Sequence, residues 1–226
     1  MTQEDHTAQV AIVDYGLGNL FSVAQACAYA GLQPHITASP REIEKAKGVI
    51  IPGVGAFGNA METLARLDLV SVLRDVATSD APLLGICLGA QLLLDESEEF
   101  GAHVGLGIIP GRVSSLGKPH EGTRILKVPQ VGWNRVRKSA TPGAINSWSD
   151  SLLDGQDDGT FMYFVHSYVM KPENDAVVLS VSNYGDVEFC SGMAWGNVTA
   201  LQFHPERSGP DGLRIYQRLA ERIRGL

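Results

Sequence analysis

The segment PLLGICLGAQLLL, residues 82–94, decides the fold of this chain. Two apolar runs flank Gly85, Cys87 and Gly89, which predicts a buried strand, a sharp turn and then a helix. The two glycines remove the side-chain clashes that such a turn would otherwise create, so the turn lifts Cys87 onto the corner between strand and helix. A cysteine at a helix N-terminus favours the thiolate over the thiol, because the dipole and the free N–H groups stabilise negative charge.

The segments before this turn alternate between strand-like and helix-like patterns. Apolar runs predict strands at residues 10–14, 33–37 and 48–51. Helices are predicted at residues 19–30, where Asn19 can act as the N-cap, and at residues 61–76. This alternation predicts an α/β fold with an open, mostly parallel sheet that is flanked by helices on both faces.

Residues from about 105 to 191 are richer in strands and turns, which predicts an antiparallel or mixed extension of the sheet. A strand at residues 198–203 then returns, and a closing helix is expected to begin at Asp211. Active sites of open α/β sheets lie at the carboxyl ends of strands, where Cys87 and His204 are both expected. Strands of the extension are expected at Ile108 and at residues 124–128, 161–165, 177–181 and 187–190.

Length and composition indicate one globular unit. The 226 residues are 44% hydrophobic without a compositional break, so a single domain is expected at residues 10–226 after a polar tail at residues 1–9. The tail lacks the features of a signal peptide, and three cysteines, an odd number, favour a reduced, cytoplasmic protein. A net charge of −7 disfavours a nucleic acid partner, and no apolar run is long enough for a membrane span. No Cys/His spacing fits a zinc site, so no metal is expected.

A second motif, His204-Pro205-Glu206, lies near the C-terminus. In an extended segment the histidine and the glutamate would point to the same face, and the proline would fix the backbone between them. A nucleophilic cysteine needs a base, and the base needs a third group that orients it. The alternative is that Cys87 is a small buried hydrophobe, as Cys27 and Cys190 are expected to be, and that the histidine is a core residue. The glycines around Cys87 and the separate His-x-Glu pair favour a catalytic triad.

Several segments carry a resemblance to a known family. GICLGAQ at residues 85–91 and QFHPERS at residues 202–208 resemble the two signatures of class I glutamine amidotransferases, which identify only that superfamily. Further segments resemble the glutaminase subunits of imidazole glycerol phosphate synthases. They are DYGLGNL (14–20), PGVGAF (52–57), GLGIIPGRV (105–113), PQVGWN (129–134) and FVHSY (164–168). The resemblance runs from about residue 10 to the C-terminus and implies the flavodoxin-like class I glutaminase fold.

The resemblance also implies an enzyme and a partner. Members of this family hydrolyse L-glutamine through a thioester on the cysteine, here Cys87, with His204 moving protons and Glu206 orienting the imidazole. They need no cofactor. They pass the ammonia to a separate (β/α)8-barrel cyclase subunit, which makes imidazole glycerol phosphate and aminoimidazole carboxamide ribotide in histidine biosynthesis. The working unit that the resemblance implies is a heterodimer with that cyclase.

Further roles are expected for residues around the nucleophile. The N–H of Leu88, which follows the nucleophile, is a natural oxyanion donor. By resemblance Val54 supplies the second donor, and Gly53 lets that peptide flip without a Cβ clash. Resemblance places Gly55, Gln91, His166, Ser167 and Tyr168 at the glutamine pocket, although His166 also has a purely structural interpretation. It places Asn19, Trp133, Asn134 and Arg207 at the partner interface. Family members commonly carry lysine at the last position, where arginine keeps the charge but not the shape.

Several alternatives stay open at the level of sequence. The turn at Gly16 and Gly18 resembles the start of a dinucleotide fingerprint, but Phe21 stands where a third glycine would fall, so a tight turn or a partner-facing loop is favoured. Another class I glutaminase, such as that of anthranilate or guanylate synthesis, would share the triad. A cysteine hydrolase or a catalytically silent binding module of the same fold would need no ammonia acceptor. The acidic run at residues 95–99 is expected to be a solvated helix end that points away from the nucleophile.

Overall fold

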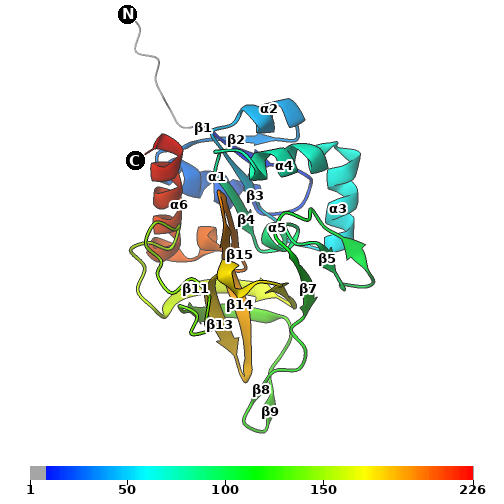
Figure 1. Cartoon of the computed structure of the whole chain (residues 1–226), viewed down its shortest axis with the longest axis vertical. Helices are drawn as coiled ribbons and strands as arrows, with labels where there is room; N and C mark the ends of the chain where they lie inside the picture. Colours follow the sequence, from blue (N-terminus) through cyan, green and yellow to red (C-terminus); the bar gives the residue numbers. More distant parts are fainter. Residues whose placement is uncertain (1–8, 226) are drawn as a thin grey trace, which may run out of the picture.

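A parallel sheet forms the centre of the molecule (Figure 1). The computed structural model describes residues 9–225, so residues 1–8 of the expected polar tail lie outside the described part, while Gln9 begins the first strand. The strands at residues 33–37 and 48–51 match the prediction residue for residue. The parallel strands lie in the order β2 (Gln33–Thr37), β1 (Gln9–Val13), β3 (Gly48–Ile51), β4 (Leu83–Ile86) and β15 (Val198–Leu201).

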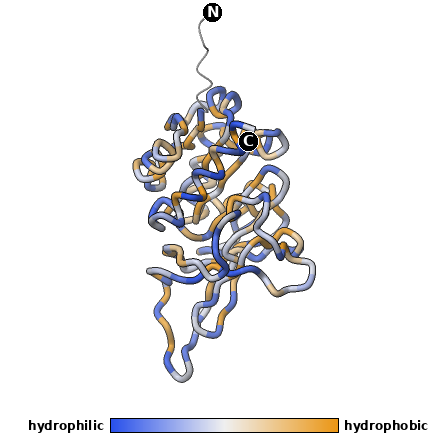
Figure 2. Tube along the Cα trace, turned by 90° about the vertical axis from the view of Figure 1, so that its left-hand side faces the viewer, coloured by the Kyte–Doolittle hydropathy of each residue, from blue (hydrophilic) through white to orange (hydrophobic). Residues whose placement is uncertain are grey.

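Helices cover both faces of this sheet, as predicted. Successive residues of β1 alternate between the faces, because side chains of a strand point to opposite sides. Val10 and Ile12 belong to one apolar core, whereas Ala11 and Val13 belong to the other. Figure 2 shows apolar and polar residues alternating along the helices, as expected for helices with one buried face. The first core lies under α1 (Leu20–Tyr29) and α6 (Gly209–Arg224), and the second under α2 (Pro40–Lys45), α3 (Phe57–Arg66) and α4 (Leu69–Ala77).

The predicted mixed extension of the sheet is confirmed. It continues from β15 through antiparallel β14, which pairs with β12 and β13, and then through β7, β5 and β6. A separate ribbon of β10 and β11 and a projecting hairpin of β8 and β9 complete this part (Figure 1). The bounds are β5 (Glu96–Ser97), β6 (His103–Val104), β7 (Gly111–Ser115), β8 (His120–Glu121), β9 (Arg124–Ile125), β10 (Gln130–Val136), β11 (Thr160–His166), β12 (Tyr168–Pro172), β13 (Val178–Tyr184) and β14 (Val187–Trp195).

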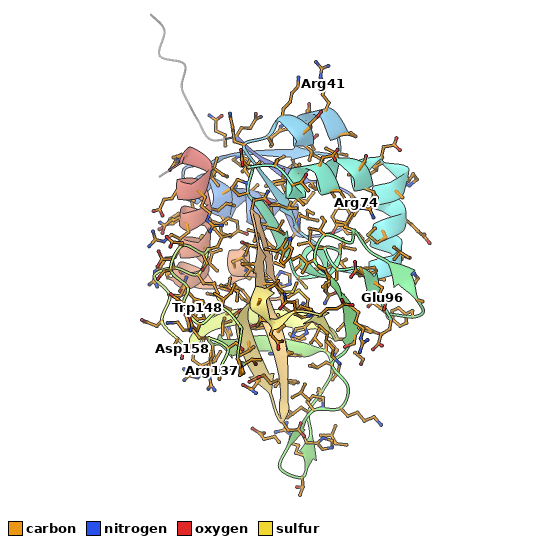
Figure 3. The ribbon with its side chains drawn as sticks, in the orientation of Figure 1. Arg41, Arg74, Glu96, Arg137, Trp148 and Asp158 are labelled. Atoms are coloured by element: carbon orange, nitrogen blue, oxygen red, sulfur yellow. The ribbon has the colours of Figure 1, made fainter. Side chains whose placement is uncertain are left out.

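Two side chains fasten long connections onto this framework (Figure 3). The indole Nε1 of Trp148 donates to the carbonyl oxygen of Leu179 at 2.8 Å, which holds the segment between β10 and β11 against β13. Arg74 Nε, on α4, donates to the carbonyl oxygen of Leu106 at 2.7 Å. Across residues 9–225, no helix combines the length and the apolar composition that crossing a membrane requires.

Several predicted boundaries were wrong, each for a local reason. The helix predicted at residues 61–76 is two helices, because Asp68 adopts a left-handed conformation with φ 56° and breaks it. Ile108 is not in a strand, since its N–H donates back to Leu93 O at 2.9 Å in a turn. The strand expected at residues 124–128 ends at Ile125, because its antiparallel partner β8 offers only His120 and Glu121 for pairing.

The remaining boundary errors lie near the C-terminal half. The strand expected at residues 177–181 begins only at Val178, after a 3-10 turn, η1 (Asp175–Val177), that Asn174 caps. α6 begins at Gly209 rather than at Asp211, because Pro210 occupies its first turn, where the fixed φ of proline suits a helix start. The predicted N-cap of α1 is confirmed, since the side-chain oxygen of Asn19 accepts from Ser22 N at 3.2 Å.

Candidate active site

The strand-to-helix turn holds Cys87 in a strained backbone conformation. Cys87 follows β4 with φ 54° and ψ −110°, and α5 (Leu88–Gln91) is a single helical turn. The flanking glycines are required by close packing: a Cβ at Gly89 would fall on the carbonyl oxygen of Ile51, and one at Gly85 would lie 2.8 Å from Ala90 Cα. The predicted reason for the two glycines is confirmed, and the packing fixes the cysteine in place.

The neighbouring strand brings a histidine and a glutamate to the same corner. Cys87 N donates to Leu201 O at 2.7 Å, which ties the turn to the end of β15. His204 Nδ1 then lies 2.8 Å from Glu206 Oε1, and both side chains are buried. The expectation of an extended segment was wrong, because Pro205–Arg207 forms a 3-10 turn, η2. The turn nonetheless brings the carboxylate of Glu206 onto the imidazole.

The electrostatics of His204 favour the protonated imidazole. Burial by itself lowers the pKa of His204, but the negative charges of Cys87 and Glu206 outweigh burial, and the net effect is a raised pKa. The Nε2 atom makes no hydrogen bond of its own, although Cys87 lies near enough to act on the pKa. An imidazolium that is oriented by a carboxylate and faces a sulfur can hold a thiolate and later give up a proton.

His166 has a different environment and remains neutral. Burial lowers the pKa of His166 to about 4, more than the hydrogen bond to Tyr168 raises it. Its Nδ1 lies 3.0 Å from the carbonyl oxygen of Tyr168, which can only accept, so Nδ1 carries the proton. The ring packs against Phe164 and Phe189, with centroids at 5.7 and 5.0 Å. These contacts favour the structural interpretation of His166 over acid–base work.

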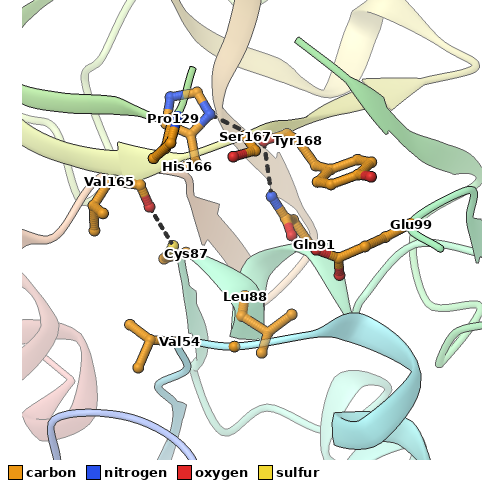
Figure 4. A pocket seen from close by; sticks show the side chains of 11 residues that line it. Val54, Cys87, Leu88, Gln91, Glu99, Pro129, Val165, His166, Ser167 and Tyr168 are labelled. Atoms are coloured by element: carbon orange, nitrogen blue, oxygen red, sulfur yellow. Dashed lines mark hydrogen bonds between the residues drawn. The ribbon is translucent and has the colours of Figure 1, made fainter. Parts of the chain in front are cut away.

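A cavity of about 230 Å³ opens beside Cys87 (Figure 4). The five residues that resemblance places at the glutamine pocket all line it, and the amide of Gln91 donates to Tyr168 O at 3.0 Å. The cavity therefore presents the sulfur at one end and polar backbone at the other. Its lining consists of Val54, Gly55, Cys87, Leu88, Gln91, Glu99, Pro129, Val165, His166, Ser167 and Tyr168.

Glu99 corrects the expectation for the acidic run at residues 95–99. The run is not a helix end that points away, because α5 stops at Gln91 and the chain turns back through β5. Glu99 Oε2 accepts from Phe57 N at the start of α3, at 2.6 Å, and the side chain lines the cavity. Nothing in the spacing of the sequence pointed to Glu99, since the contact joins segments 42 residues apart.

In the turn that follows β3, the Gly53–Val54 peptide has the opposite orientation to the one expected of an oxyanion donor. The N–H of Leu88 donates to Gly53 O at 3.3 Å, so the Gly53 carbonyl faces the nucleophile turn. Because the peptide is planar and trans, the N–H of Val54 points the opposite way. Tyr15 holds the same turn by donating from its hydroxyl to Pro52 O at 2.6 Å. Of the two expected oxyanion donors, one is occupied and the other is turned away.

Three of the four expected interface residues, Asn19, Trp133 and Arg207, are exposed. Trp133 is 57% exposed and belongs to strand β10 rather than to a turn, with its ring edge-on to Tyr163 at 6.2 Å. The guanidinium of Arg207 stacks over the same Tyr163 ring, 4.5 Å from its centroid. Asn19 is exposed at the start of α1. Asn134 instead donates to Asn183 O at 2.9 Å, toward the body of the protein.

The fold and this geometry define a class: a triad-type cysteine enzyme built at the strand ends of an open α/β sheet. A family model described as glutamine amidotransferase class-I matches residues 11–221. Imidazole glycerol phosphate synthase subunit HisH from Moorella thermoacetica is 44% identical over 95% of both chains, and that from Bacillus thuringiensis is 44% identical over 91% of both. The chain therefore belongs to the class I glutamine amidotransferase family and, within it, to the HisH subunits of imidazole glycerol phosphate synthase.

Solved structures agree at the level of the fold. The structure of PurLQS from Thermotoga maritima superposes with a TM-score of 0.70 at 17% identity, covering 94% of this chain and 97% of that chain. The glutaminase domain of CTPS from Trypanosoma brucei superposes with a TM-score of 0.66 at 15% identity, covering 97% of this chain and 94% of that one. The predicted fold class is confirmed by these neighbours.

Proposed function

We propose that this chain hydrolyses L-glutamine at Cys87 and delivers the ammonia to the cyclase subunit of imidazole glycerol phosphate synthase. The observation that carries the proposal is the position of Cys87: a strained, buried cysteine at a strand end, beside the hydrogen-bonded pair of His204 and Glu206. Membership of the HisH subunits supports the same activity.

The chemistry follows from the three side chains. The Cys87 thiolate attacks the carboxamide carbon of glutamine, and the carbonyl oxygen becomes an oxyanion. His204 gives a proton to the leaving nitrogen, so ammonia departs and a glutamyl thioester remains on the sulfur. A water then attacks the thioester, His204 takes its proton, and glutamate leaves as the thiolate is restored. Glu206 holds the proton of Nδ1 and stabilises the imidazolium in both steps.

The cavity fits an amino acid with its amide toward the sulfur. Glu99 is the carboxylate in the lining, and it can bind the α-ammonium group of glutamine through a charge-assisted hydrogen bond. The backbone of Ser167 and Tyr168, and the side chain of Gln91, line the remaining polar wall. The ion pair between this ammonium group and Glu99 is stronger than the same pair in bulk water, because a partly buried site screens charge less.

The oxyanion donors explain how a partner can control the rate. With the Gly53 carbonyl on Leu88 N, the site lacks the second donor, and Leu88 itself is engaged. A flip of the Gly53–Val54 peptide would release Leu88 and bring the Val54 N–H inward. One such donor is worth about 3–4 kcal/mol of transition-state stabilisation. We therefore assign this geometry to a resting state that the cyclase converts to an active one.

We assign the partner as a (β/α)8-barrel cyclase, whose own residues catalyse the cyclisation. The exposed cluster of Trp133, Tyr163 and Arg207 lies next to His204 and offers aromatic and cationic groups of the kind enriched at interface hot spots. Val54 is 43% exposed and lines the cavity beside Cys87, so a docked subunit can act on its peptide directly.

The test is Cys87→Ala in the complex with the cyclase. Glutamine-dependent glutamate release should fall by at least about 10⁴-fold, because the thioester cannot form. Product formation from added ammonium salt should persist, since that chemistry lies in the cyclase. Cys190→Ala is the matched control, as this cysteine is also buried but does not line the cavity, and it should retain glutaminase activity. Glutaminase activity above a trace in Cys87→Ala would refute the assignment.

A further inference from the structure

A buried glutamine that the mechanism above does not use lies against the nucleophile. Gln202 is fully buried and follows β15, two residues before the proposed base. Its backbone N–H donates to Ser191 O at 3.0 Å, which continues the pairing with β14 beyond the end of the strand. The side chain is therefore held under the corner where Cys87 stands, rather than on the surface.

The side-chain contacts of Gln202 form a chain that ends on the sulfur. Gln202 Nε2 lies 3.8 Å from Cys87 Sγ, within reach of a hydrogen bond to sulfur. Gln202 Oε1 accepts from Gln91 Nε2 at 3.0 Å, and Gln91 Nε2 also donates to Tyr168 O at 3.0 Å. His166 Nδ1 donates to the same carbonyl. The chain thus links the nucleophile to the polar wall of the substrate cavity, and Figure 4 shows the part of it that joins Gln91 and His166 to Tyr168.

This network fixes which end of the Gln202 amide faces the sulfur. Tyr168 O is a carbonyl and can only accept, so the atom of Gln91 that reaches it must be the NH₂ group. The same NH₂ group faces Gln202, which must present its oxygen in return. The NH₂ group of Gln202 is left to face Cys87. The sulfur therefore has an N–H donor on one side, and on the other side the acceptor Val165 O at 3.6 Å.

The two neighbours of the sulfur favour opposite protonation states. A thiol can donate to Val165 O, whereas a thiolate cannot, so of these two neighbours only Gln202 stabilises the thiolate. A hydrogen bond to the charged form stabilises that form. The titratable groups around this corner are His204 and Glu206 from the segment after β15 and Tyr15 from the segment after β1. His166 of β11, Tyr168 of β12 and Glu99 line the same cavity as the sulfur.

We propose that Gln202 is a positioning residue for the glutaminase reaction, which donates from its amide to the Cys87 sulfur and couples the thiolate to Gln91 in the substrate cavity. The inference rests on the proposed function, because it takes Cys87 as the nucleophile. Gln202 acts on the thiolate, so its removal changes the pH at which the sulfur reacts. A residue that only filled space in the core would leave that pH unchanged.

The experiment is the pH dependence of Cys87 alkylation by iodoacetamide in the full chain. Gln202→Leu keeps the shape but removes the donor, and it should raise the pH of half-maximal alkylation by about one unit, a tenfold loss of thiolate at a fixed lower pH. Gln202→Glu keeps the acceptor for Gln91 but places a carboxylate oxygen on the sulfur, so it should raise that pH further. In the assay with glutamine, both variants should lower kcat at neutral pH and recover part of it at higher pH.

Controls separate the possible failures. Gln156→Leu removes another buried glutamine, whose amide donates to Asp211 O away from the cavity, and its alkylation profile should match the wild type. Cys87→Ala should abolish the fast alkylation, because burial raises the pKa of Cys27 and of Cys190 to about 12. Fast alkylation that survives Cys87→Ala would count against the proposed function itself. An unchanged or lowered half-maximal pH in Gln202→Leu would overturn the role of Gln202, whatever Gln202→Glu shows, because the added carboxylate disfavours the thiolate by itself.

Discussion

Two turns meet at the carboxyl edge of the sheet, and they differ in how firmly packing holds them. The turn at residues 85–89 is locked, because its glycines touch the backbone of Ile51 and Ala90 and no side chain fits there. The turn at residues 52–55 is held by single hydrogen bonds, from the Tyr15 hydroxyl to Pro52 O and from Leu88 N to Gly53 O, and it carries a half-exposed valine. The nucleophile is thus rigid, while the peptide that should complete the oxyanion site is not.

The difference teaches where control over the reaction resides. A nucleophile must be placed to within a fraction of an ångström, so its strained backbone is fixed by the core of the protein. A backbone donor that can turn inward or outward is suited to a response to the partner. The predictions below perturb the locked turn first and the movable turn last.

Gly89→Ala should give the largest effect, because it breaks the locked turn. The new Cβ would overlap the carbonyl oxygen of Ile51, so the helix turn must shift away from β3. We expect the free energy of unfolding to fall by about 3 kcal/mol, and kcat to fall by about 10²-fold as the sulfur is displaced. Chemical denaturation and glutamate release measure the two effects. Gly196→Ala, at an open turn with positive φ, should cost only about 1 kcal/mol and leave kcat unchanged; equal losses in both variants would mean that packing does not lock the turn.

Addition of the cyclase together with the ribonucleotide that is its substrate should give the next largest effect, through the movable turn. If the partner turns the Val54 N–H inward and frees Leu88 N, glutaminase kcat should rise by about 10²–10³-fold. Steady-state rates of the isolated chain, of the binary complex and of the nucleotide-bound complex measure this directly. Equal rates in the three states would mean that the turn is not a switch.

The environment of His166, which lines the same cavity as Cys87, is tested by the pH dependence of protein stability rather than by a reaction rate. Its pKa of about 4 in the folded protein lies below the ordinary value of 6.5, so protons bind better to the unfolded chain. The contribution of His166 to the free energy of unfolding is fully present above pH 6.5. As the pH falls from 6.5 toward 4, the free energy of unfolding decreases by about 3 kcal/mol. Urea unfolding of the wild type and of His166→Leu should show parallel stabilities above pH 7 and a smaller acid loss in the variant. Identical slopes between pH 6.5 and 4 would contradict a neutral, buried His166.

Val54→Gly should have the smallest effect. It tests whether the valine side chain holds the movable turn in its resting conformation. Turning the Gly53–Val54 peptide inward changes φ of Val54 by up to about 180°, toward positive values that a β-branched residue avoids. Glycine removes a cost of about 1–2 kcal/mol, so the isolated chain should gain about tenfold in basal glutaminase rate. The activation by the cyclase should shrink by a similar factor. A basal rate at or below that of the wild type would show that φ of Val54 does not hold the resting state.

The sequence by itself determined the parts of this protein that depend on neighbours along the chain. The glycines around Cys87 predicted the turn, the apolar runs predicted the parallel strands, and Asn19 predicted the cap of α1. Each of these features is local, because turn conformation, strand burial and capping are decided within a few residues. Motif resemblance added the family, which the comparisons confirm.

Only the tertiary structure decided which distant groups complete the site. Glu99 enters the cavity because the chain reverses after α5, and Gln202 reaches the sulfur because β15 pairs with β4. The direction of the Gly53 carbonyl likewise depends on the hydrogen bond that it accepts from Leu88 N. Periodicity cannot reveal such contacts, since they join residues far apart in the chain and depend on the direction of single hydrogen bonds.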